Sequence, residues 1–89
     1  MKAILTVIGQ DKPGIIAGVS TFLAQHNVNI EDISQTIMQD KFTMIMMVNL
    51  TNCDVELQTL VVLAQQLGEQ IGVAISLRHE DIFNAMHTI

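Results

Sequence analysis

The chain has 89 residues, a length that fits one small folding unit, and we expect residues 1–89 to form a single domain. It carries nine Asp and Glu residues against four scattered Lys and Arg residues, which excludes direct binding to nucleic acid or to an anionic membrane surface. No apolar run reaches the roughly 20 residues of a bilayer span, no separate signal-peptide core is present, and the single Cys53 cannot form an intramolecular disulfide, so we predict a cytoplasmic protein.

The first half of the chain predicts a strand, a helix and two further strands. Residues 3–8 form a short β-rich run that ends at a glycine, which is typical of a buried strand. From Ile15 the apolar residues recur at helical spacing over about a dozen residues. Residues 30–38 and 42–50 are extended stretches, the second with strict alternation, and Asp40-Lys41 is the predicted turn between them.

A second helix is predicted after residue 54. Asp54 or Asn52 is expected to cap its start, because short polar side chains accept hydrogen bonds from the free N–H groups there. Gly68 and Gly72 are expected at its frayed end. The predicted buried stripe recurs at helical spacing and consists of Leu57, Leu60, Val61, Ala64, Leu67 and Ile71.

Alternating apolar residues predict a fourth strand over residues 73–77, and a short helix is expected from about Asp81 to Met86. The order is therefore βαββαβ followed by an appended helix. Right-handed βαβ crossovers interleave two such units into one four-stranded antiparallel sheet. We predict an α+β, ferredoxin-like sandwich with two helices on one face of the sheet.

Both faces of this sheet are expected to be apolar in its first and third strands. Ala3, Leu5 and Val7 point to one face of the first strand, while Ile4 and Ile8 point to the other. An antiparallel sheet that is covered on one side only should carry polar residues on its open side. Because 49% of the residues are also hydrophobic, we expect a second copy of the chain to cover or extend the sheet as a homodimer.

Two segments are candidates for a ligand site. The turn Gly9–Gly14 leads into the first helix, whose free N–H groups and partial positive charge can hold an anionic group. Asp11 at its tip either caps the helix or contacts a ligand. The polar cluster at residues 29–34 either lines a site or forms a solvated sheet edge. Both pairs of alternatives stay open at the level of sequence.

These segments carry a resemblance to a known family. Ile8-Gly-Gln-Asp-Lys-Pro-Gly-Ile-Ile16, a helix, and Val28-Asn-Ile-Glu-Asp-Ile33 resemble the ACT domain, a small regulatory module that binds amino acids. More narrowly, the chain is similar to small stand-alone ACT proteins and to the ACT domains of the glycine-cleavage repressor group. The resemblance implies a ligand at a dimer interface, between the first-strand turn of one subunit and the start of the second strand of its partner.

The resemblance also implies particular ligand-binding residues. Asp11 occupies the place of a polar turn residue that is often Asn, and Gly14 and Ile15 offer close approach of the backbone. Asn29 matches the polar residue ahead of the second strand, and Ile30 offers main-chain groups. A carboxylate at Asp11 favours the ammonium group of a ligand.

No catalytic residue, metal site or cofactor is predicted. His26, His79 and His87 have neither metal-ligand spacing nor a neighbouring cysteine, and the residues offer no nucleophile with its base. We therefore predict a non-catalytic regulatory domain that binds an amino acid or a similar small metabolite and signals to a partner protein. The alternative is an ACT-like interaction module without a small-molecule ligand, which docks through its sheet edge or its apolar face.

Overall fold

The computed structural model describes residues 1–81 and confirms the βαββαβ order. Most strand and helix bounds differ from the predicted ones by one or two residues. The predicted C-terminal helix falls on residues 82–89 apart from its start, so it lies outside the described residues. The elements are β1 (Lys2–Gln10), α1 (Ile15–Gln25), β2 (Asn29–Met38), β3 (Lys41–Asn49), α2 (Leu57–Ile71) and β4 (Ala74–His79).

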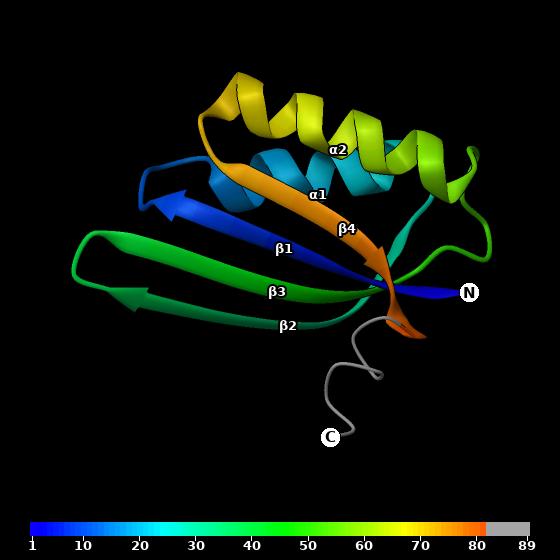
Figure 1. Cartoon of the computed structure of the whole chain (residues 1–89), viewed down its shortest axis with the longest axis horizontal. Coiled ribbons are helices and arrows are strands. Elements are labelled where there is room, and N and C mark those ends of the chain that lie inside the picture. The colour runs from blue at the N-terminus through cyan, green and yellow to red at the C-terminus, as the bar shows by residue number, and fades with distance from the viewer. Residues whose placement is uncertain (82–89) are drawn as a thin grey trace.

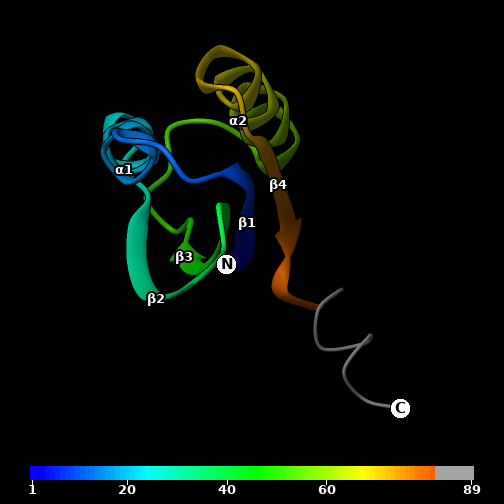
Figure 2. The same ribbon diagram turned by 90° about the vertical axis from the view of Figure 1, so that its left-hand side faces the viewer.

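The four strands form one sheet in the order β2-β3-β1-β4, and every neighbouring pair is antiparallel. Both helices lie on the same face of this sheet, as Figures 1 and 2 show from two directions. The predicted ferredoxin-like sandwich is therefore confirmed. Because β1 and β3 occupy the middle, β2 and β4 are the two edge strands among residues 1–81, and within this part of the chain each has one unpaired row of backbone groups.

The core lies between the helices and the face of the sheet that they cover. Leu5 in β1 and Met44 and Met46 in β3 are completely buried, and Leu23 meets them from α1. Alternation explains this arrangement, since every second residue of a strand points to the same face. Met44 and Met46 thus serve in core packing, where their flexible side chains fill irregular space.

The opposite, open face of the sheet is apolar only along its middle. Ile8 in β1 and Ile45 in β3 lie on this face and are 52% and 41% exposed. The edge strands place polar side chains beside them: Ser34 of β2 pairs with Ile45, and Ser76 of β4 pairs with Thr6 of β1. The predicted two-faced apolar character therefore holds for the central strands and not for the edges.

The caps of both helices differ from the prediction. Gly14, with φ 90°, is the N-cap of α1, and Glu56 is the N-cap of α2; neither helix start has a side-chain cap. Asp54 does not cap α2, because its Oδ1 lies 2.8 Å from His26 Nδ1 and its N–H donates to the His26 carbonyl oxygen. Asn52 lies too far before Glu56 to act as the N-cap.

Gly68 is also placed differently from the prediction. It is buried within α2 rather than at a frayed end, and α2 continues to Ile71. A Cβ at Gly68 would lie 2.6 Å from the Val73 carbonyl oxygen, so glycine is what lets the helix approach β4. Gly72, with φ 78°, ends the helix in the left-handed conformation that glycine adopts most readily.

Candidate functional site

The β1–α1 turn delivers the chain into a helix whose first N–H groups have no side-chain partner. Gly14 supplies the left-handed conformation, and its carbonyl oxygen accepts the first helical hydrogen bond, from the Gly18 N–H at 2.9 Å. Asp11 is exposed and makes no capping bond, so the capping alternative is wrong. The turn therefore presents both a helix N-terminus and an exposed carboxylate to solvent.

One backbone hydrogen bond and two close approaches at glycines position this turn. The Asp11 N–H donates to the Asp40 carbonyl oxygen at 2.9 Å, which joins the turn to the β2–β3 hairpin. A Cβ at Gly9 would lie 2.7 Å from Val73 Cγ1, so glycine there leaves room for Val73. A Cβ at Gly72 would lie 2.6 Å from Lys12 Nζ, which places the ammonium group at the negative, C-terminal end of α2.

The acidic side chains at the start of β2 take part in hydrogen bonds and an ion pair. Glu31 lies at an irregularity in the β2–β3 register, where one Oε accepts a hydrogen bond from Asn49 Nδ2 at 3.1 Å and the other lies 3.1 Å from Lys2 Nζ. The Asp32 carboxylate accepts a bond from the following N–H at 2.9 Å. The hydrogen bond from Asn49, and then the one from Lys2, hold the pKa of Glu31 below its ordinary value of 4.5.

This geometry predicts how Glu31 titrates. A pKa lowered in the folded state gives stability that is present above the unfolded-state pKa and is lost as the pH falls through the folded-state pKa. We expect Asn49→Ala to raise the pKa of Glu31 toward 4.5, because the largest stabilising contact is removed. Carboxyl NMR titration of both proteins measures this shift, with Glu69 as an exposed control carboxylate on α2. Identical Glu31 midpoints would contradict the assignment.

The two halves of the predicted site lie at opposite ends of the sheet. Gln10, next to Asp11, pairs with Lys41 of β3, whereas Asn29 pairs with Asn49, eight residues further along the same strand. At about 3.4 Å per residue the two ends are roughly 27 Å apart, and Figure 1 shows the turn and the start of β2 at opposite ends. One subunit therefore does not bring Asp11, Gly14 and Ile15 together with Asn29 and Ile30.

The two regions differ in what they offer to a ligand. The Ile15 side chain is 3% exposed and packs in the core, so only its main chain is available. Asn29 has an exposed side chain, and Ile30 is half-buried at the edge strand.

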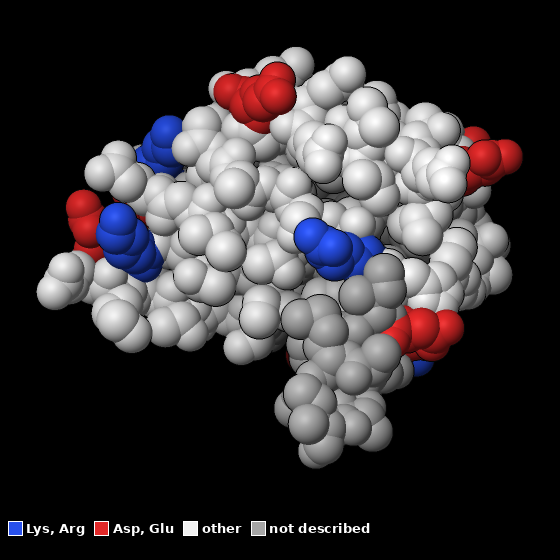
Figure 3. All heavy atoms as spheres, in the orientation of Figure 1, with Lys and Arg blue, Asp and Glu red and all other residues white. Residues whose placement is uncertain are grey.

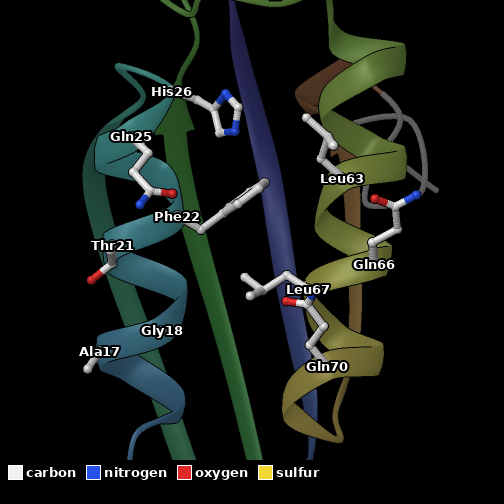
Figure 4. Close-up of a pocket in the computed structure, with 10 residues that line it drawn as sticks. All are labelled: Ala17, Gly18, Thr21, Phe22, Gln25, His26, Leu63, Gln66, Leu67 and Gln70. Atoms are coloured by element: carbon white, nitrogen blue, oxygen red, sulfur yellow. The ribbon is translucent and has the colours of Figure 1, made fainter.

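Two hollows were not predicted from the sequence. The larger, of about 540 Å³, lies between α1 and α2, where Phe22 and Leu67 point into the gap from the two helices (Figure 4). Glutamines line it on both helices, and His26 lies at its end, with the Phe22 and His26 rings edge to face at 5.0 Å. The second, of about 420 Å³, lies where β2 begins and β3 ends. Its lining comes from two stretches that are distant in the sequence, residues 27–29 and 49–52, so no local sequence pattern marks it.

The charged side chains visible in Figure 3 are scattered, with acidic and basic ones side by side at the left edge, and that face shows no basic patch. Within residues 1–81 no group of three or more His, Cys, Asp or Glu side chains is arranged to hold a metal ion. The helices of this same part of the chain are too short or too polar to cross a bilayer.

Comparison with known proteins gives a consistent result. A family model described as the ACT domain matches residues 2–74. The chain is 50% identical over 88 residues to a UPF0237 protein from Methanopyrus kandleri, covering 99% of this chain and 98% of that protein. Among solved structures it is similar to an ACT domain protein from Streptococcus pneumoniae, with a TM-score of 0.83, 40% identity and 93% of each chain covered.

Two regulatory proteins have a similar fold over part of their length. One is a putative glycine cleavage system transcriptional repressor, with a TM-score of 0.72, 23% identity, and 86% of this chain and 44% of that chain covered. The other is the ligand-free regulatory subunit of aspartate kinase from Thermus thermophilus, with a TM-score of 0.66, 26% identity, and 86% of this chain and 50% of that chain covered.

Proposed function

The chain belongs to the ACT domain family, and from this premise we propose that it is a non-catalytic regulatory domain that binds an amino acid or a similar small metabolite between two copies of itself. The M. kandleri relative is covered to 98%, so it consists of little more than this domain. The proposed domain signals to a partner protein, in line with the expectation from the sequence.

The observation that carries the proposal is that the two half-sites lie at opposite ends of the sheet, and that β2, which begins at one of them, is an edge strand among residues 1–81. β1 and β2 both run antiparallel to β3, so both end on the side of the sheet where the β1–α1 turn lies. If β2 pairs antiparallel with β2 of a second copy, the start of one β2 meets the end of the other. Asn29 and Ile30 of the partner subunit then approach Asp11, Gly14 and Ile15.

The exposed side chains of β2 support this mode of assembly. Ile33 and Ile37 are 44% and 55% exposed, and Met38 is 68% exposed. A ten-residue strand with apolar side chains and an unpaired backbone edge is prone to pair with another strand. Pairing about a twofold axis makes two equivalent sites, each with parts from both subunits.

The chemistry of each half suits one part of a zwitterion. The free N–H groups at the start of α1 suit the α-carboxylate, because the helix N-terminus carries a partial positive charge. The Asp11 carboxylate suits the α-ammonium group, and the Asn29 amide of the partner subunit can donate to or accept from the ligand. A ligand held in this way joins the two subunits.

A thermal-shift screen of the twenty amino acids tests the proposal. A ligand present at about 100 times its Kd stabilises the folded state by about 2.7 kcal/mol. For a ligand found in this way, we expect Asp11→Ala and Asn29→Ala each to weaken binding about tenfold, because each removes a polar contact worth roughly 1–2 kcal/mol. Calorimetry measures the Kd.

Gln65→Ala is the control, since it removes an exposed polar side chain from the middle of α2, away from both ends of the sheet. Unchanged affinity in both site variants would refute the assigned residues. Failure of every amino acid and metabolite to stabilise the protein would instead favour the second candidate function, an interaction module that uses the free β2 edge to dock on a partner.

A further inference from the structure

A hollow on the open face of the sheet is lined mainly by apolar side chains. It has a volume of about 170 Å³, and its lining residues, from β1, β2 and β3, are Ile4, Asp32, Ser34, Ile45 and Met47. Figure 2 shows α1 and α2 together on the other side of the sheet, so neither of these helices covers the hollow. The hollow therefore presents apolar surface that a further segment can bury.

The apolar side chains of this face differ in exposure from one end of the sheet to the other. Ile4 and Ile8 both point to the open face of β1, yet Ile4 is 9% exposed and Ile8 is 52% exposed. Ile4 does not belong to the core beneath the helices. Ile45, which also lines the hollow, is 41% exposed. The face is therefore most enclosed around Ile4, and the hollow extends from there toward Ile45.

The chain leaves β4 at this same end of the sheet. β4 pairs antiparallel with β1, so Arg78 stands opposite Ile4 and His79 stands opposite Ala3. Directly after the strand, the Asp81 N–H donates to His79 Nδ1 at 3.0 Å, which turns the chain locally at the strand end. Residues 82–89 therefore begin at the end of the sheet where Ile4 lies.

The sequence of residues 82–89 suits an apolar surface. Its apolar residues recur at the spacing of one helix face, as Ile82, Phe83, Met86 and Ile89. Eight residues of helix are about 12 Å long, and β4 and β3 lie two strand spacings apart, about 10 Å. The segment is therefore long enough to cross β1 and reach the hollow. It contains no Asp or Glu, so it brings no acidic side chain toward Asp32.

We propose that residues 82–89 are the occupant of this hollow and that Phe83 packs against Ile4, Ile45 and Met47. An aromatic side chain gains most from leaving water at such a place, because it carries the largest apolar area. The segment then shields the apolar middle of the open face from a second copy of the chain. Self-association is thereby directed away from stacking of the open faces and toward the β2 edge.

A single tryptophan reports on this packing, because the chain has neither Trp nor Tyr of its own. In the Phe83→Trp protein we expect emission at shorter wavelength, and several-fold weaker quenching by acrylamide, than in the Asn84→Trp protein. Asn84→Trp is the matched control, since residue 84 lies on the opposite side of the predicted helix.

A second substitution in the Phe83→Trp protein identifies the surface. Ile45→Gln places an amide in the hollow and should raise quenching to the level of the Asn84→Trp control. Val62→Gln makes a similar change at an exposed position on α2 and should leave quenching unchanged. Met47→Gln serves in place of Ile45→Gln if circular dichroism shows that the latter does not fold.

The outcomes decide the inference without any ligand, so it stands or falls separately from the proposed function. Protection of the indole at every protein concentration, lost on the change at position 45 or 47 and kept on the change at Val62, supports it. Equal quenching in the Phe83→Trp and Asn84→Trp proteins overturns it. So does protection that survives in the folded hollow variants, or protection that grows with protein concentration, because a second copy would then be the cover.

Discussion

Ile33→Lys is expected to dissociate the proposed dimer, raising its dissociation constant at least about a hundredfold. β2 spans Asn29–Met38, so its midpoint lies between Ile33 and Ser34. Pairing about this midpoint brings the two copies of residue 33 close together at the twofold axis. Two lysines there repel each other, and like charges in an interface cost several kcal/mol.

The folded subunit should tolerate this change, because Ile33 is already 44% exposed. Val62→Lys is the matched control: Val62 is 50% exposed on α2, and it undergoes the same replacement of a branched aliphatic side chain by a cation. Sedimentation velocity at micromolar concentration measures the assembly state. If the Ile33→Lys protein sediments as a dimer like the control, the β2 edge is not the interface.

The same variant connects assembly with ligand binding. A site that takes Asp11 from one subunit and Asn29 from the other cannot form in a monomer, so Ile33→Lys should lose amino-acid binding as well. By reciprocity, a ligand that joins two subunits strengthens the dimer by the same factor by which dimerisation strengthens ligand binding. This linkage would let the ligand concentration control how much dimer is available to a partner protein.

Gly68→Ala is expected to lower the free energy of unfolding by about 1–3 kcal/mol through overpacking. The added Cβ would lie 2.6 Å from the Val73 carbonyl oxygen and 3.3 Å from the Ile75 backbone nitrogen. Both are backbone atoms, one in β4 and one directly before it, so they cannot move aside as a flexible side chain would. The helix propensity that alanine gains over glycine, about 1 kcal/mol, is too small to offset the separation of α2 from β4.

Gly18→Ala is the control, because it makes the same change in α1 where there is space. Its Cβ would lie 3.9 Å from Ile71 Cδ1, an ordinary van der Waals contact. We expect it to be neutral or to stabilise by about 0.5–1 kcal/mol through helix propensity. Urea unfolding of both variants at one protein concentration, which a dimer requires, measures the difference. If the two variants have equal free energies of unfolding, α2 can shift away from β4 without a loss of stability, and the prediction is wrong.

Local rules account for the parts of the fold that could be predicted. The start of α1 at Ile15 follows from Pro13 and Gly14, which restrict or free the backbone irrespective of the rest of the chain. Alternation likewise predicts that Met44 and Met46 are buried. The predictions for Asp54 and Gly68 failed because distant residues decide both: His26 binds Asp54, and Val73 requires a glycine at position 68.

Some features of the candidate site could likewise be predicted from short segments, and others could not. Sequence by itself determined the ACT family, the sandwich fold, and the turn and strand start that carry Asp11 and Asn29, because these depend on short segments with characteristic residues. Only the tertiary structure decided that the two segments lie at opposite ends of the sheet and that residues 27–29 and 49–52 line one pocket. The reason is that strand order and register come from packing over the whole chain: β3 separates β1 from β2, and a site that uses both segments must include a second copy.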